Sequence, residues 1–231
     1  MSAASLTWAG EPVHLLADRA LWWPGGQALF VADVHLGKAA AYRALGQPVP
    51  AGTTDDNLAR LDALLTAHPV RDLVFLGDLL HAPQGVTPAL LQRLRTWRDA
   101  HAEVAMTLVR GNHDLRAGDP PPEMGITVVD EPHGMGPFAA CHHQQRVPGC
   151  FVLAGHLHPA VALNGPARDR LRLPCFCVDA GPEPGEGLAV LPAFGAFTGT
   201  WQVTPAPGRQ VYAVGGGAVW PVPISERSAG G

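Results

Sequence analysis

Five short apolar runs, each followed by a polar residue, are the main feature of the hydrophobic pattern. They occupy residues 28–32, 73–76, 106–109, 138–141 and 151–154. Uninterrupted apolar runs of this length are typical of strands that are buried on both faces of a sheet. Between the first three runs, apolar residues recur at helical spacing. The order strand, helix, strand, helix, strand predicts parallel strands joined by right-handed crossovers.

Two helices are predicted between these strands. Thr53 or Thr54 is a suitable N-cap for the first, because a hydroxyl group can accept a hydrogen bond from the first helical turn. The second has Thr87 as its expected N-cap and Pro88 at its first helical position. The apolar faces consist of Leu58, Leu61, Leu64 and Leu65 in the first helix and Leu90, Leu91, Leu94 and Trp97 in the second.

Strands are also predicted towards both ends of the chain. Five further segments with strand character lie at residues 13–16, 20–23, 171–178, 188–191 and 210–214. These segments would form additional sheet packed on the α/β part. No long linker or internal repeat divides the chain, so residues 1–224 are predicted to form a single domain and residues 225–231 a flexible tail.

Composition narrows the class of protein. Hydrophobic residues make up 47% of the 231 positions, enough for a sizeable core, and the 27 Gly and 23 Pro residues predict many turns. The formal net charge of −4 argues against a nucleic-acid binder that depends on a strongly basic surface, although it leaves room for a local basic groove. We find no secretory signal and no apolar stretch of about 18 residues, so a cytoplasmic protein without a membrane partner is expected.

Two groups of side chains allow either a functional or a structural interpretation. The chain has four cysteines, Cys141, Cys150, Cys175 and Cys177. Their spacing does not form a paired C-x-x-C framework. Cys175 and Cys177 lie in an apolar run, which favours buried thiols over a metal or redox pair. Trp22, Trp23 and Trp97 could stack on nucleic-acid bases, but packing in the core is favoured for them as well.

Side chains that can bind metal ions stand just after the five apolar runs. In the order of the runs they are Asp33, Asp78, Asn112, His142 and His156. Because ligands of open α/β sheets bind beyond the carboxyl ends of the strands, these side chains are expected to share one site. His35 and His158 follow two residues after Asp33 and His156, and an extended chain would point both members of each pair the same way. One strand-end Asp or His is usually structural, but five coincident strand ends predict a functional site.

These residues form a series of motifs along residues 33–158. The motifs are Asp33-Val-His35, Gly77-Asp78, Gly111-Asn112-His113-Asp114, His142 and Gly155-His156-Leu-His158. In this order and combination the chain resembles the calcineurin-like metallophosphoesterase superfamily. The resemblance implies an α/β fold, a four-layer α/β/β/α sandwich with two mixed β-sheets, and a two-metal centre at the sheet edge.

The same resemblance assigns the ligands position by position. One metal would be held by Asp33, His35 and His158, the other by Asn112, His142 and His156, and Asp78 would bridge both. Two divalent cations about 3.5–4 Å apart repel each other, and an anionic carboxylate between them offsets this repulsion. Imidazole, carboxylate and amide ligands suit Mn²⁺, Fe or Zn²⁺, of which Mn²⁺ is expected first.

Three residues of the expected site need separate comment. His143 is the alternative to His142 as a ligand, but adjacent residues on a strand point to opposite faces, and His142 directly ends its apolar run. His113 is the candidate for proton transfer, and Asp114 would orient its imidazole and raise its pKa. The implied reaction is hydrolysis of a phosphodiester by in-line attack of a metal-bridging hydroxide, with His113 protonating the leaving oxygen.

Further matching segments extend over nearly the whole chain. They are residues 33–38, Arg43, Gly46, 50–53, 77–81, 155–159, 172–176 and 191–195. They resemble a narrower group, the bacterial ligase-associated metallophosphoesterases (PdeM-type), a group of DNA damage response endonucleases or phosphodiesterases. This resemblance implies DNA as substrate, single-stranded or with end structures, in DNA repair beside a ligase, a helicase and an exonuclease. Lys38 and Arg43 would contact phosphate or else be solvated surface charges, and His81 would line the site or be a neighbour.

Two other classes of function remain open. An enzyme that acts on a small phosphoester, such as a nucleotide, fits the acidic net charge and the absence of a basic run. A catalytically inactive scaffold of the same superfamily should have lost ligands. Every expected ligand position and His113 are filled here, so the scaffold is disfavoured.

Overall fold

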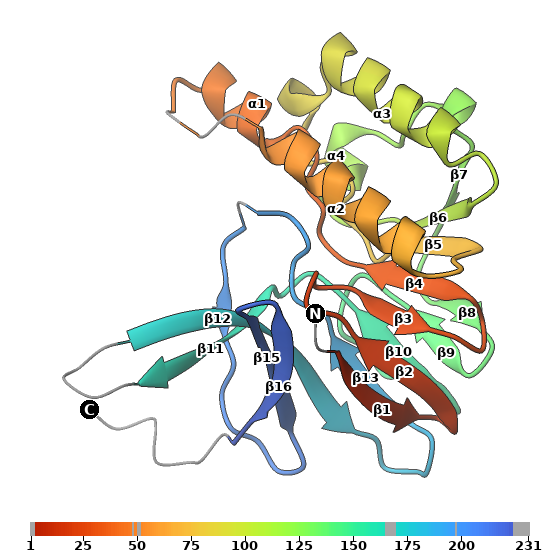
Figure 1. The fold of residues 1–231 in the computed structure, drawn as a ribbon, viewed down its shortest axis with the longest axis vertical. Helices are drawn as coiled ribbons and strands as arrows, with labels where there is room; N and C mark the ends of the chain where they lie inside the picture. Colours follow the sequence, from red (N-terminus) through yellow and green to blue (C-terminus); the bar gives the residue numbers. More distant parts are fainter. Residues whose placement is uncertain (1–2, 48, 50–51, 165–169, 197, 224–231) are drawn as a thin grey trace.

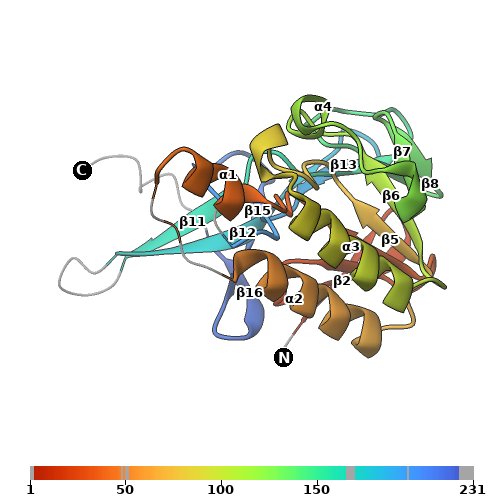
Figure 2. The same cartoon turned by 90° about the horizontal axis from the view of Figure 1, so that it is seen from above.

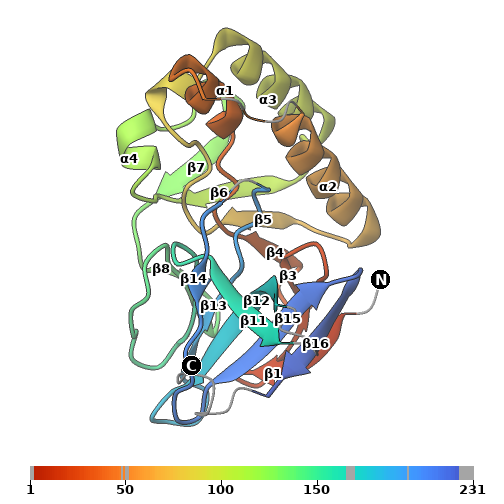
Figure 3. The ribbon, with the colours of Figure 1, turned by 90° about the vertical axis from the view of Figure 1, so that its left-hand side faces the viewer.

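The computed structural model describes residues 3–47, 49, 52–164, 170–196 and 198–223. Two β-sheets pack face to face, and the helices gather on the outer face of one of them (Figure 1). The view in Figure 3 shows the order of the layers as helices, first sheet and second sheet. The expected α/β class with two mixed sheets is confirmed. The predicted tail at residues 225–231 lies outside the described residues.

The first sheet has seven strands in sequential order. They are β1 (Ala4–Trp8), β2 (Glu11–Leu15), β3 (Leu21–Trp23), β4 (Ala28–Val31), β5 (Asp72–Phe75), β6 (Ala105–Val109) and β7 (Ile126–Val129). The strands from β1 to β4 form an antiparallel meander, and those from β4 to β7 run parallel. The helices fall on the crossovers between the parallel strands, as the alternating pattern predicts.

The helices cover the outer face of the first sheet. They are α1 (Lys38–Ala44), α2 (Thr53–Ala67), α3 (Pro88–Ala100) and α4 (Asp114–Ala117), with short 3₁₀ turns η1 (Pro83–Gly85) and η2 (Pro122–Met124). The long helices α2 and α3 run side by side (Figure 2), and the indole of Trp97 donates a hydrogen bond of 2.7 Å to Asp62. Leu61 and Leu94 are buried against the sheet. No helix in the described part of the chain has both the length and the apolar character needed to cross a membrane.

The two long helices begin in different ways. Thr87 caps α3 as predicted, because its hydroxyl accepts a hydrogen bond of 3.2 Å from the N–H of Leu90. The prediction that Thr53 or Thr54 caps α2 is wrong, since both lie within the helix and Gly52 is the N-cap. Gly52 has a φ of 93°, a left-handed conformation that suits glycine, and it carries no side chain that could cap the helix.

The second sheet contains the remaining strands. They are β8 (His133–Met135), β9 (Phe138–Ala140), β10 (Phe151–Ala154), β11 (Pro159–Asn164), β12 (Arg170–Ala180), β13 (Gly187–Val190), β14 (Trp201–Gln202), β15 (Gln210–Gly215) and β16 (Ala218–Val222). β10 runs parallel to both β9 and β13, whereas β12 pairs antiparallel with β11, β13 and β15. Within the described residues no helix follows Met124, so the fourth layer expected on this sheet is not found there. Loop residues such as Val147 and Val203 pack on its outer face.

The core between the sheets follows from the alternation of side chains along each strand. On β4, Phe30 faces the second sheet and Leu29 faces the helices. On β12, Phe176 faces the first sheet, whereas Cys175 and Cys177 face the outer side. These strands are apolar at successive positions because both of their faces are covered.

The two cysteines and three tryptophans for which the sequence favours a place in the core are buried, whereas Leu65 and Leu91 on the helix faces are half-buried. Cys175 and Cys177 are free thiols with 0% and 3% exposure. Trp22, Trp23 and Trp97 are 5%, 9% and 6% exposed. These three indoles are therefore not accessible for stacking on nucleic-acid bases.

Replacing Phe176 with Ala is expected to lower the free energy of unfolding by about 3–5 kcal/mol, because it opens a cavity between two rigid sheets. Chemical denaturation of both proteins measures the difference. Leu171→Ala, on the same strand but at a position that is 56% exposed, is the control and should change stability by less than about 0.5 kcal/mol. Equal effects of the two substitutions would contradict this placement of the core.

Candidate metal centre

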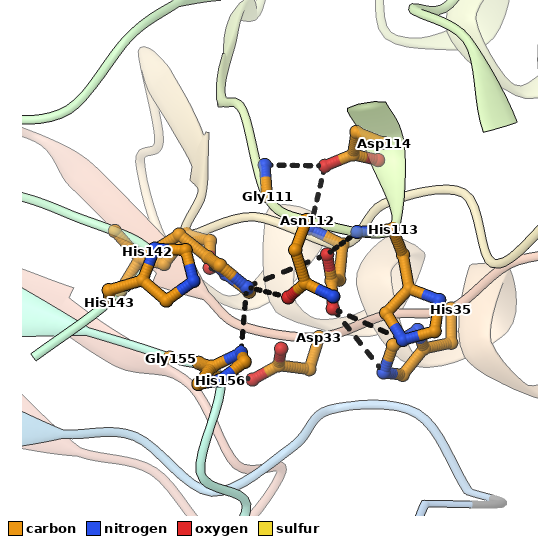
Figure 4. Close-up of polar contacts among 12 residues, drawn as sticks. Asp33, His35, Gly111, Asn112, His113, Asp114, His142, His143, Gly155 and His156 are labelled. Carbon is orange, nitrogen blue, oxygen red and sulfur yellow. Dashed lines mark hydrogen bonds and ion pairs between the residues drawn. The ribbon is translucent and has the colours of Figure 1, made fainter. Parts of the chain in front are cut away.

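The carboxyl ends of strands from both sheets meet at one edge of the sandwich. In the first sheet β4, β5 and β6 lead into Asp33, Asp78 and Asn112, and in the second sheet β9 and β10 lead into His142 and His156. The backbone N–H of His156 donates a hydrogen bond of 2.9 Å to Oδ2 of Asp33, which joins the sheets directly at this edge. Figure 4 shows Asp33, Asn112, His142 and His156 gathered around a common centre. The structure thus brings together the residues at the ends of all five apolar runs.

The loops that follow the strands have an unusual backbone. Asp33, His35, Asp78, His156 and His158 all adopt left-handed φ values, between 51° and 69°. The expectation that each i, i+2 pair points to one site because the chain is extended is therefore wrong, although both pairs do face the same site. A left-handed conformation costs a residue other than glycine roughly 1–2 kcal/mol, and such strain persists where surrounding contacts impose it. Strained positions of this kind cluster at functional sites.

Asp33, His35 and His158 form one group of metal-binding atoms. Nε2 of His158 lies 3.4 Å from Nε2 of His35 and 3.4 Å from Oδ1 of Asp33. Nδ1 of His158 faces the carbonyl oxygen of Gly199 at 3.0 Å, and a carbonyl can only accept, so Nδ1 donates and Nε2 is left facing the group. Burial lowers the pKa of His35 far below its usual value, so its imidazole is neutral and keeps a lone pair for a cation.

Asn112, His142 and His156 form a second group. Nε2 of His142 lies 3.0 Å from Oδ1 of Asn112 and 3.1 Å from Nδ1 of His156. Nδ1 of His142 donates to the carbonyl oxygen of Leu76 at 3.0 Å, which leaves the lone pair on Nε2. Burial lowers the pKa of both histidines, which keeps them neutral and able to bind a metal ion.

Asp78 lies between the two groups. Its Oδ1 is 3.6 Å from Nε2 of His142, and its Oδ2 is 4.0 Å from Nε2 of His35. Asp78 and Asp33 are 2% and 0% exposed, and burial together with the charge of Asp33 raises the pKa of Asp78. Oδ1 of Asp33 has no hydrogen-bond partner among the described residues. Buried carboxylates with an unpartnered oxygen need a counter-charge, so this set of donor atoms fits divalent metal ions.

His113 lies beside Asp78, and its side chain is partly exposed. Its backbone N–H donates to Oδ1 of Asp78 at 2.8 Å, and its Nε2 lies 3.9 Å from Oδ2 of the same carboxylate. The ring is oriented by the carbonyl oxygen of His81, to which Nδ1 donates at 2.7 Å. The rings of His81 and His113 stack with centroids 4.8 Å apart. His81 therefore lines the site and is more than a neighbour in sequence.

Asp114 does not orient the imidazole of His113, which corrects the expectation from the sequence. Its buried carboxylate accepts hydrogen bonds from the backbone N–H groups of Asp78 at 2.7 Å, Gly111 at 2.9 Å and Leu80 at 3.0 Å. Both oxygens thus join the loops that follow β5 and β6. Burial raises the pKa of Asp114 to about 6, although the three N–H groups favour the ionised form. Asp114 is a positioning residue for the loop that carries Asp78.

Glu131 positions the opposite side of the centre and was not identified from the sequence. Its Oε2 accepts hydrogen bonds from the N–H groups of His142 and His143 at 2.7 and 2.8 Å, and its Oε1 accepts from Nδ1 of His143 at 2.7 Å. His142 is fully buried beside Asp78, whereas the side chain of His143 is 46% exposed, so the geometry favours His142 as the ligand. Glu131 comes soon after the β-branched segment Ile-Thr-Val-Val at 126–129, a strand signal that could have identified it.

The two expected phosphate contacts lie on different sides of α1. Lys38 begins the helix close enough to Asp33 and Asp78 for their charges to act on its ammonium group. Arg43 is exposed and lines a separate cavity with the first turns of α2 and α3. The structure therefore places Lys38 near the centre and does not bring Arg43 there.

The chain matches no protein-family model. It also matches no curated protein. Among solved structures it is similar to one described as the crystal structure of Pseudomonas putida nuclease MPE. The two sequences are 45% identical, the match covers 96% of this chain and 100% of the other, and the TM-score is 0.81. A similarity of this extent spans nearly the whole chain.

Replacing Asp114 with Ala is expected to lower the free energy of unfolding by about 3–5 kcal/mol, because three buried N–H groups lose their acceptor. Because the loop of Asp78 is then unsupported, the affinity for Mn²⁺ should fall by about 10–100-fold. Denaturation and calorimetric titration with Mn²⁺ measure the two effects. Asp119→Ala, a nearby exposed acid paired with Arg110, is the control. Normal stability and metal affinity in Asp114→Ala would contradict this positioning role.

Proposed function

The chain belongs to the family of the Pseudomonas putida nuclease MPE, and from this premise we propose that it is a metal-dependent nuclease. The observation that carries the proposal is the convergence of two buried carboxylates, four imidazoles and one amide where the two sheets meet. Hydrolysis of a phosphodiester needs a site that activates water and neutralises negative charge, and divalent cations held by such donors supply both. The substrate we propose is DNA, single-stranded or with end structures.

The arrangement of the donor atoms supports two cations. Asp33, His35 and His158 would hold one, Asn112, His142 and His156 would hold the other, and Asp78 would be shared. Within each group the closest donor atoms lie 3.0–3.4 Å apart, and Asp78 directs one oxygen towards each group. Mixed nitrogen and oxygen donors suit Mn²⁺, and they also suit Fe or Zn²⁺.

His113 is the proton donor in this proposal. Because a carbonyl oxygen only accepts, the contact with His81 requires a hydrogen on Nδ1 of His113. Nε2 is then the nitrogen that gains and loses the catalytic proton, and it would protonate the leaving oxygen of the substrate. The side chain of His113 is 29% exposed, so a bound substrate can reach it.

The biological setting is proposed from the sequence motifs alone. They support a cytoplasmic role in DNA repair beside a ligase, a helicase and an exonuclease. A small phosphoester is the second candidate substrate, because the net charge of −4 gives little general attraction to a polynucleotide.

With Mn²⁺, the protein is expected to hydrolyse bis(p-nitrophenyl) phosphate and a single-stranded DNA oligonucleotide, and chelation of the metal should abolish both activities. Asp78→Asn removes the charge shared by the two groups and should lower kcat on both substrates by about 100-fold or more. Asp72→Asn, at the opposite end of β5, is the matched control. An oligonucleotide that stays intact while the small ester is hydrolysed would favour the second candidate substrate. Full activity of Asp78→Asn would refute the proposed centre.

His113→Ala is expected to bind Mn²⁺ normally and to lose about 10²–10⁴-fold in kcat on the oligonucleotide, because an alkoxide leaving group needs a proton. The loss on the p-nitrophenyl ester should be much smaller, since that phenolate leaves without protonation. Steady-state kinetics and calorimetric titration give the two readouts, with His14→Ala, which removes a half-buried histidine of β2 paired with Ser5, as the control. Undiminished cleavage of the oligonucleotide would remove His113 from the mechanism.

A further inference from the structure

We propose that a cavity beside α1 binds the nucleotide next to the scissile phosphodiester, with Tyr42 as the platform for its base and Lys38 as the partner of its phosphate. This inference rests on the proposed nuclease function and specifies which form of nucleic acid the site accepts. A base that is already stacked inside a duplex cannot stack on a side chain, so the occupant is a nucleotide of a single strand.

The cavity opens between α1 and the segment that precedes β14. Lys38 and Tyr42 line it on the side of the helix, Thr198 and Gly199 line the opposite wall, and Gln47 lies beyond the end of α1. Its volume is about 520 Å³, and sites for small organic molecules usually measure about 300–1,000 Å³. The cavity therefore has room for a nucleoside.

Both walls of the cavity are joined to the metal centre. On one side the carbonyl oxygen of Gly199 accepts the hydrogen bond from Nδ1 of His158 at 3.0 Å. On the other side the ring of Tyr42 lies nearly parallel to that of His81, with centroids 5.9 Å apart and planes at 17°. The ring of His81 in turn lies 4.8 Å from that of His113, with planes at 19°. Three roughly parallel rings thus lead from the centre to the cavity.

The positive charge of Lys38 lines this cavity and is available to contact a phosphate. Lys38 and Tyr42 are four residues apart on α1, so both side chains lie on the same face of the helix. The ammonium group of Lys38 is 5.9 Å from the centroid of the Tyr42 ring. The chain has 16 Lys and Arg residues, and Lys38 is the only lysine among them. The ammonium group of a lysine is a compact point charge that can contact one phosphate oxygen.

The test compares two single strands of equal length, oligothymidylate and a strand made of abasic tetrahydrofuran units. Both carry the same phosphodiesters, but only the first has bases. Stacking on an aromatic side chain contributes about 1–3 kcal/mol per base, so Tyr42→Ala should raise KM for oligothymidylate by about 10-fold or more. The same substitution should leave KM for the abasic strand unchanged. Tyr42→Phe, which keeps the ring, should behave like the unaltered protein on both strands.

Two further variants keep this test decisive. Tyr42→Leu retains the apolar volume without the ring, so it should reproduce the effect of Tyr42→Ala even if the alanine variant folds poorly. Leu45→Ala, at a 72% exposed position that directly follows the same helix, should leave KM for both strands unchanged. If Tyr42→Leu leaves KM unchanged for both strands, or raises it equally for both, the proposal that Tyr42 stacks on a base is wrong. If the unaltered protein cleaves neither strand with Mn²⁺, the proposed function itself has failed.

Lys38 is tested through salt dependence. Each phosphate contact to a single strand contributes about 0.7 to the slope of log affinity against log salt concentration. Lys38→Gln should therefore flatten the slope for both strands by about this amount and raise both KM values, because the phosphates are common to both. An unchanged slope would show that Lys38 does not contact the phosphate.

Discussion

Two negative charges buried where the sheets meet, on Asp33 and Asp78, are the constraint on which the rest of the structure depends. Removing an ionised carboxylate from water costs several kcal/mol unless a cation and hydrogen bonds compensate for it. The chain supplies part of this compensation itself, through the N–H of His156 to Asp33 and the N–H of His113 to Asp78. Burial lowers the pKa of His35, His142 and His156, so these imidazoles supply lone pairs rather than positive charge. The contact of His158 with Asp33 raises the pKa of that imidazole despite its burial. Bound cations would supply the remaining compensation.

The geometry of the centre is maintained by residues that do not themselves face it. Asp114 joins the loops after β5 and β6, and Glu131 fixes the backbone that carries His142. Gly111 allows these loops to approach closely, because a Cβ atom at this position would lie 2.5 Å from the backbone nitrogen of Asp78. The strained φ values of the candidate ligands are imposed by this set of contacts. The centre is therefore rigid because two sheets and several loops determine it together.

The positions of the candidate ligands could be predicted from the sequence because strands buried on both faces are plainly apolar. A polar residue directly after such a run marks the point where the chain leaves the sheet. The direction of a side chain was harder to predict. Asp114 is adjacent to His113 in sequence, yet its carboxylate points to backbone N–H groups of other loops. Adjacency along the chain does not specify contact in space.

The side of α1 on which each residue lies could not be predicted for a similar reason. This helix consists mostly of alanine, so it has no apolar stripe that would reveal its inner face. Lys38 and Arg43 were therefore treated alike from the sequence, and only the structure separates them. The arrangement of the second sheet is also set by contacts between segments far apart in the chain, such as the pairing of β12 with β15. The local pattern of apolar and polar residues does not indicate which distant strand a segment will pair with.

The hydrogen bond between Asp33 and the backbone of His156 has a consequence for the lifetime of the protein. Cations held at this junction would need both sheets to be assembled, so their binding energy would add to the stability of the folded chain by mass action. Resistance to unfolding and to proteolysis would then rise with the supply of free metal ions around the protein. In metal-poor surroundings the folded chain would be less stable, and the abundance of the protein would decline.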